Sequence, residues 1–71
     1  MSIGAERVRL KFNPSENVNV KAIKEKSAEL IDLCEKLRNE GSADGEQQRL
    51  WSLAQTHYED AAMWAVKAVT F

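Results

Sequence analysis

The chain has 71 residues and a formal net charge of −1, so it holds one small domain at most. Cores of this size seldom supply more than about 3–5 kcal/mol of stability, and small proteins add disulfides, metal ions or self-association. A single cysteine, Cys34, excludes an internal disulfide, and with the single histidine, His57, it cannot provide the four ligands of a structural zinc site. Self-association remains, and we therefore expect a homo-oligomer.

Charge and hydropathy exclude two classes of partner. The pI is about 5.8 and the mean hydropathy is -0.47. No apolar run reaches the roughly 18 residues that a membrane helix needs, and the N-terminus lacks the apolar core of a signal peptide. We expect a cytoplasmic protein that binds neither duplex nucleic acid nor membranes.

The charge is unevenly distributed along the chain. Residues 1–26 contain six Lys/Arg and three acids, a local charge of +3, and the remainder has a charge of −4. A basic end on an acidic body favours one anionic ligand or an acidic partner near that end. Ordinary scatter of surface charge is the alternative.

The first predicted element is an extended segment. Residues 6–12 read E-R-V-R-L-K-F and alternate basic with apolar side chains, which is the period of a strand. Since the sequence offers no second strand, this segment must lie across helices or pair with another copy. The turn formers at 13–15, with Pro14 among them, end it.

The first predicted helix covers residues 20–39, after an N-terminal segment and turn over residues 1–19. Asn17 or Asn19 can cap it. Apolar spacings of three and four predict its buried seam. That seam comprises Val20, Ile23, Ser27, Leu30, Cys34 and Leu37. Glycines and short polar residues predict a loop over residues 40–44.

The second predicted helix covers residues 45–71, with Asp44 as N-cap and Gln47 completing a capping box. Its expected seam comprises Leu50, Ala54, His57, Ala61, Trp64, Ala68 and Phe71. A further apolar stripe lies beside this seam, and one partner helix cannot cover both. The expected oligomer interface comprises Trp51, Tyr58, Ala62, Trp64 and Val69. The predicted fold is all-α: one domain over residues 1–71, with the extended segment followed by an antiparallel helical hairpin.

Candidate catalytic residues are few. Cys34 and His57 could form a nucleophilic pair, yet no third residue supports it at a recognisable spacing. Glu59 with Asp60, or Glu29 with Asp32, could act as paired carboxylates, yet acids at these spacings are common on the solvated face of a helix. Phosphate-binding loops, metallohydrolase helices and dinucleotide turns are missing from the sequence. We expect no enzyme, no cofactor and no metal site.

A basic cluster with an aromatic side chain suggests a ligand. Arg9, Lys11 and Phe12 precede the turn, and Lys24 and Lys26 follow on the first helix. Nucleotides need cations for their phosphates and a flat side chain for their bases. In the alternative interpretation, Phe12 belongs to the core and the lysines only increase solubility.

Three segments carry a resemblance to a known family. They are R-L-K-F-N-P-S at 9–15, A-I-K-E-K-S-A-E-L-I-D-L-C at 22–34 and E-D-A-A-M-W-A-V-K-A-V-T-F at 59–71. Together they resemble the phage anti-CBASS cyclic-oligonucleotide sponges, which share a helical-hairpin domain with the Thoeris anti-defence sponges. The resemblance covers residues 9–71, and the A-M-W-A segment at 62–65 is its most specific part.

The resemblance implies a homohexamer that sequesters cyclic di- and trinucleotides such as cGAMP, without cleaving them, in an infected bacterial cell. It implies that Phe12 stacks on a base and that Lys24 meets a phosphate, with Lys26 close by. The family often has a tyrosine where this chain has Phe12. The expected ligand site also includes Arg9, Lys11 and Asn13. A second, trinucleotide pocket would use Lys26 and Lys67.

Two other functions stay open. One is a sponge for the cyclic ADP-ribose-type signals of Thoeris defence. The other is a helical module that binds no small ligand and contacts a host protein through the stripe that contains Trp51 and Trp64.

Overall fold

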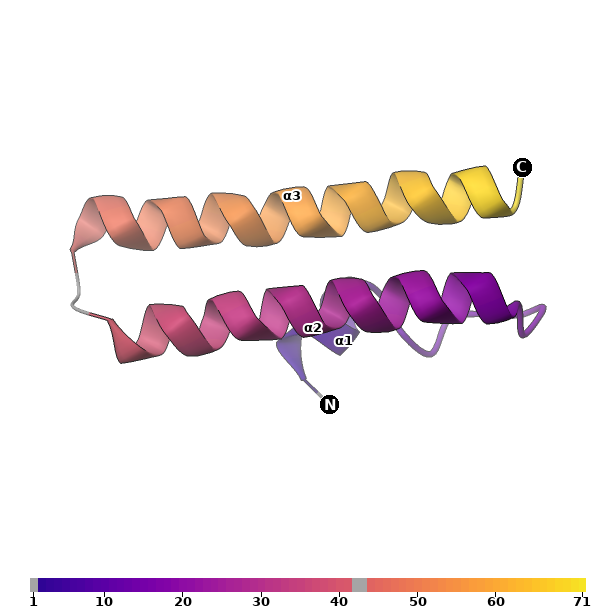
Figure 1. Ribbon diagram of the computed structural model, residues 1–71, viewed down its shortest axis with the longest axis horizontal. Coiled ribbons are helices and arrows are strands. Elements are labelled where there is room, and N and C mark those ends of the chain that lie inside the picture. The colour runs from indigo at the N-terminus through magenta and orange to yellow at the C-terminus, as the bar shows by residue number, and fades with distance from the viewer. Residues whose placement is uncertain (1, 42–43) are drawn as a thin grey trace.

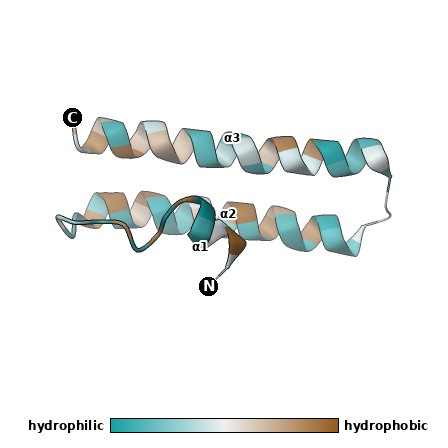
Figure 2. Ribbon diagram, turned by 180° about the vertical axis from the view of Figure 1, so that it is seen from behind, coloured by the Kyte–Doolittle hydropathy of each residue, from teal (hydrophilic) through white to brown (hydrophobic). Residues whose placement is uncertain are grey.

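The computed structural model describes residues 2–41 and 44–71. In these ranges the chain forms three helices and no strand: α1 (Ile3–Arg7), α2 (Val18–Glu40) and α3 (Gly45–Val69). Helices α2 and α3 lie antiparallel as a hairpin (Figure 1). The view from behind shows α1 and the segment after it lying over α2 (Figure 2). The predicted all-α class and the hairpin are confirmed.

Polar caps set the helix starts. The Asn17 side chain accepts hydrogen bonds from the backbone N–H groups of Asn19 and Val20, at 2.8 and 3.1 Å, so α2 begins two residues before the predicted start. Asp44 accepts in the same way from Glu46 and Gln47 at the start of α3. Helix α3 ends at Val69 and not at residue 71. The predicted loop includes residues 42 and 43, which lie outside the described residues.

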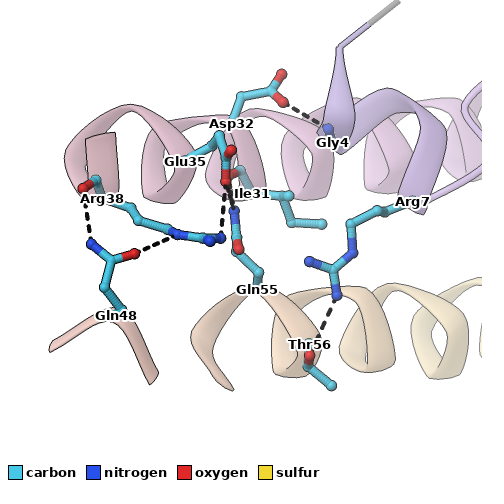
Figure 3. Close-up of polar contacts among 9 residues, drawn as sticks. All are labelled: Gly4, Arg7, Ile31, Asp32, Glu35, Arg38, Gln48, Gln55 and Thr56. Carbon is cyan, nitrogen blue, oxygen red and sulfur yellow. Dashed lines mark hydrogen bonds and ion pairs between the residues drawn. The ribbon is translucent and has the colours of Figure 1, made fainter. Parts of the chain in front are cut away.

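The predicted extended segment at residues 6–12 is wrong. Its first two residues belong to α1, and turns follow over residues 8–11. The Ser2 side chain accepts from the backbone N–H of Ala5 and caps α1, and the N–H of Gly4 donates to Asp32 of α2 at 2.7 Å (Figure 3). An isolated strand would leave its backbone groups unpaired, whereas this arrangement satisfies several of them and buries apolar side chains.

The predicted seams are largely wrong. Of the expected α2 seam only Val20 and Cys34 are buried, while Leu30 and Leu37 are exposed. No residue of the expected α3 seam is fully buried. The buried positions are Val20, Lys24, Ala28, Ile31 and Cys34 on α2, and Gln55 and Ala62 on α3. The faces through which α2 and α3 contact each other are therefore not the most apolar faces of these helices.

The core is small and lies where all three elements meet. Val8, Ala28, Ile31 and Ala62 form it, with Leu10 and Ile23 packed against it. Ile31 has no exposed surface. The two alanines allow α2 and α3 to approach closely at this point. The principal extents of the molecule are 42 × 21 × 12 Å, and the shortest is about the diameter of one helix.

A ladder of polar contacts joins α2 and α3 beside the core (Figure 3). The buried amide of Gln55 donates to the Ile31 carbonyl at 3.2 Å and to Glu35 at 3.1 Å. Arg38 pairs with Glu35 and donates to Gln48 at 2.7 Å. These directional contacts set the register of the hairpin, because a shift of either helix would leave the Gln55 amide buried without a partner.

None of the described helices is both long enough and apolar enough to cross a membrane.

Candidate ligand-binding groove

A groove of about 520 Å³ lies between the N-terminal segment and α3. Its volume falls within the roughly 300–1,000 Å³ typical of small-molecule sites. Lys24 of α2 contributes to its lining. The other lining residues are Arg7, Val8, Arg9 and Phe12 of the N-terminal segment and Thr56, His57, Glu59, Asp60, Ala62, Met63 and Val66 of α3.

A tight turn shapes one wall of this groove. Arg9 has a φ of 56°, in the left-handed region, and the chain reverses so that the N–H of Phe12 donates to the Arg9 carbonyl at 2.8 Å. The Lys24 ammonium donates to the same carbonyl at 3.0 Å and also to the Phe12 carbonyl. These two hydrogen bonds hold the turn against α2 and offset the strain of the left-handed backbone at Arg9.

Lys24 is buried, with 7% of its surface exposed. Burial lowers the pKa of its ammonium below the ordinary 10.5, and the positive charge of Arg9 lowers it further. Its two hydrogen bonds to carbonyls leave one N–H donor of the three for another acceptor.

The turn brings two cations to the ring of Phe12. The guanidinium carbon of Arg9 lies 4.3 Å from the ring centroid, and the Lys24 nitrogen lies 5.5 Å from it. Phe12 itself is 54% exposed. Of the residues expected in the ligand site, the structure therefore brings together Arg9, Phe12 and Lys24.

The other expected ligand residues lie elsewhere. Lys11 is exposed and does not line the groove. The Asn13 side chain exchanges hydrogen bonds with the backbone of Asn17 and so supports the start of α2. Lys26 lines a shallow depression on α2 itself, and the Lys67 ammonium lies 5.2 Å from the Trp64 ring centroid on α3.

The α3 wall of the groove was not expected from the sequence. Arg7 joins the N-terminal segment to this wall: its Nε donates to Glu59 at 2.6 Å and its terminal nitrogen donates to Thr56 at 3.4 Å. Figure 3 shows Arg7 reaching from the N-terminal segment to Thr56. The one available signal was spacing, since Thr56, Glu59 and Met63 recur at three and four along one edge of α3.

The expected interface residues divide into three groups by exposure. Tyr58, Trp64 and Val69 are exposed on α3, with Trp64 at 58%. Trp51 is half-buried. Ala62 differs from the expectation, because it lies in the core against α2 and its side chain is covered within the chain.

The groove combines three cations and an accessible aromatic ring with apolar side chains, and of its two carboxylates Glu59 is paired with Arg7. These groups suit an anionic ligand with flat rings, because cations meet phosphates and the ring stacks on a base. Among residues 2–41 and 44–71, no cluster of side chains could hold a metal ion.

Comparison with known proteins places the chain in a family. No curated protein and no solved structure matches it. A family model described as Acb2/Tad1, hairpin domain, matches residues 3–70, which is nearly the whole chain. The match spans the N-terminal segment, both long helices and every residue that lines the groove. The chain therefore belongs to the Acb2/Tad1 hairpin-domain family, the family of anti-CBASS and anti-Thoeris sponges.

Proposed function

We propose that this protein binds cyclic di- or trinucleotide second messengers in the groove and sequesters them without hydrolysis. The family is one of phage sponges for cyclic nucleotide signals, which supports this class of ligand. The protein would act in the cytoplasm of the infected host cell and lower the free concentration of a messenger such as cGAMP. This role requires affinity and abundance, and it needs no catalytic group.

The observation that carries the proposal is the closeness of Arg9 and Lys24 to the ring of Phe12 in the lining of the groove. A nucleobase stacked on an aromatic side chain contributes about 1–3 kcal/mol to binding. The ribose phosphates of the same ligand would lie near the two cations. Lys24 would use its third N–H for a phosphate while it keeps the turn in place.

The wall of the groove is largely formed before the ligand arrives. The Arg9–Phe12 hydrogen bond, the Lys24 contacts and the Arg7–Glu59 ion pair hold the N-terminal segment against both long helices. A site that is already ordered loses less conformational entropy on binding. This favours tight, stoichiometric capture.

The exposed apolar surface supports a homo-oligomer, for which we propose a hexamer. Large apolar side chains outside the groove are exposed on both long helices, namely Leu30, Leu33, Leu37, Leu50, Leu53 and Trp64. A small core cannot compensate for so much exposed apolar surface, whereas burial between copies would contribute about 25 cal/mol per Å².

Calorimetric titration tests the proposal directly. The purified protein is titrated with cyclic dinucleotides, cyclic trinucleotides and cyclic ADP-ribose isomers, and the ligand is recovered after the complex is denatured. We expect tight binding of a cyclic di- or trinucleotide and recovery of the intact molecule. Binding of cyclic ADP-ribose isomers alone would replace the proposed ligand, and recovery of a linear product would contradict sequestration without hydrolysis.

Two matched pairs of variants locate the site. Phe12→Ala should weaken binding by about 1–3 kcal/mol, while Phe71→Ala removes the same side chain outside the groove and should not. Lys24→Ala should weaken binding strongly, while Lys36→Ala removes an exposed lysine from the same helix and should not. Equal affinities within each pair would place the ligand elsewhere.

The second candidate function is the binding of a host protein, which the exposed side chain of Trp64 would contact. Under that function, the titrations would show no binding of any nucleotide, and Trp64→Ala would abolish the capture of a host protein.

A further inference from the structure

We propose that Arg9 acts as a placeholder on Phe12: its guanidinium covers the ring in the free protein, leaves when a ligand base stacks there, and then pairs with a ligand phosphate. This inference rests on the proposed function and adds a positioning residue to it. It assigns Arg9 two successive contacts, of which the structure contains the first.

The geometry makes the two contacts exclusive. The Arg9 guanidinium carbon lies 4.3 Å from the Phe12 ring centroid. Stacked aromatic rings have centroids about 4.5–7 Å apart, so a base cannot occupy the same ring face while the guanidinium is there. Arg9 and Phe12 both line the groove, so a ligand there lies within reach of the ring and of the guanidinium that covers it.

The Arg9 side chain is free to move while its backbone is held. Its carbonyl accepts from Lys24 and from the N–H of Phe12, which keeps the turn in place. Its side chain is exposed, and the ion pairs found among the described residues use Arg7, Lys21, Arg38 and Arg49 instead. The guanidinium can therefore leave the ring without any change of fold.

The free energy favours replacing the Arg9–Phe12 contact by a base stacked on Phe12. A cation–π contact at an exposed site is weaker than the stacking of a base on an aromatic ring. The released guanidinium also gains a phosphate, which it can bind through two parallel hydrogen bonds. Until then, its position on Phe12 covers apolar surface that would otherwise be in contact with water.

Nuclear magnetic resonance of the arginine side chains tests the placeholder. Protons over a ring face resonate upfield, so the Arg9 side-chain protons should be shifted upfield in the free protein and should return to ordinary values in Phe12→Leu. Addition of saturating cGAMP or cyclic di-AMP, whichever calorimetry shows to bind, should remove the upfield shift in the parent protein. The Arg9→Lys variant has no guanidinium at this position, so the arginine signals that disappear from its spectrum are those of Arg9.

The outcomes separate this inference from the proposed function. Calorimetric binding with an unchanged Arg9 shift would overturn the placeholder and leave the sponge function intact, and so would the absence of any upfield shift in the free protein. Absence of binding by every nucleotide would overturn the proposed function, and the placeholder with it.

A second variant tests the phosphate contact. Arg9→Gln should weaken binding about tenfold and reduce the slope of log affinity against log salt concentration, because one cation–phosphate attraction that salt screens is lost. Arg49→Gln removes an exposed arginine outside the groove and should change neither quantity. An unchanged salt slope in Arg9→Gln would contradict the phosphate contact.

Discussion

Gly4 determines how closely α1 approaches α2. A Cβ atom at this position would lie 2.1 Å from the Ala28 carbonyl oxygen and 2.7 Å from the Asp32 carboxylate. Because the nearest atom belongs to the backbone of a helix, it cannot move aside easily. The small residue therefore permits the hydrogen bond from Gly4 to Asp32 and the packing of the N-terminal segment that forms the groove wall.

We predict that Gly4→Ala separates α1 from α2. It should lower the free energy of unfolding by about 1–3 kcal/mol and increase hydrogen exchange over residues 3–12. Gly45→Ala is the matched control, because a Cβ there meets nothing within 4 Å, and it should stabilise the protein by about 0.4–1 kcal/mol. Equal stability and exchange in the two variants would show that α1 does not depend on this close approach.

Lys24 gives the site a pH dependence. Its pKa is lowered by burial and by the charge of Arg9, so the folded protein releases this proton before the unfolded chain does. Between the lowered pKa and 10.5, the unfolded chain binds more protons, and the contribution of Lys24 to the free energy of unfolding increases with pH. The affinity for an anionic ligand changes in the opposite direction, because it declines as the ammonium loses its charge.

A titration of the Lys24 side chain by nuclear magnetic resonance should therefore give a midpoint below 10.5 in the free protein. Bound cyclic dinucleotide should raise that midpoint, since a phosphate favours the charged form. Lys24→Arg keeps its charge throughout and should remove this part of the pH dependence of affinity. A midpoint at or above 10.5 in the free protein would contradict the burial of the ammonium.

The pairing of α2 with α3 depends on a polar residue at its centre. Gln55 is 2% exposed and donates to the Ile31 carbonyl and to Glu35. Glu35 also pairs with Arg38, which donates to Gln48 further along the hairpin. The two helices are therefore aligned by directional contacts as well as by a small apolar core.

We predict that Gln55→Ala destabilises the hairpin by about 1–3 kcal/mol, because it leaves a cavity and removes a buried donor from Glu35. Ser52→Ala, at an exposed position on the same helix, should change the free energy of unfolding by less than about 0.5 kcal/mol. Chemical denaturation at one fixed protein concentration measures both. If both variants were equally stable, the ladder would contribute little to the pairing.

At the scale of the whole molecule, the apolar stripes and the hairpin contact lie on different faces. The leucines of α2, and Trp64 with the leucines of α3, are exposed, while the contact between the helices is formed by Ala28, Ile31, Gln55 and Ala62. This arrangement supports the proposed assembly of several copies through the outer faces of the hairpin.

We predict that Trp64→Ala lowers the molar mass measured by light scattering after size exclusion, because Trp64 is 58% exposed and offers a large apolar surface to a second copy. Asn39→Ala changes an exposed polar residue and should leave the mass unchanged. A parent protein that is monomeric at high concentration would contradict the proposed assembly.

Local interactions explain which features could be predicted from the sequence. The two long helices and the caps Asn17 and Asp44 depend on residues within a few positions of one another, and the family resemblance depends on short segments of sequence. Tertiary contacts set the conformation of residues 6–12, which alternate like a strand but fold onto the surface of α2. Tertiary contacts also set which helix faces meet. The closest approach of α2 and α3 requires small side chains and hydrogen-bond partners for the Gln55 amide, and the most apolar stripes stay on the outside. The α3 wall of the groove follows from the same packing. The spacing of Thr56, Glu59 and Met63 marks an edge of α3, but it does not show that this edge will face the N-terminal segment.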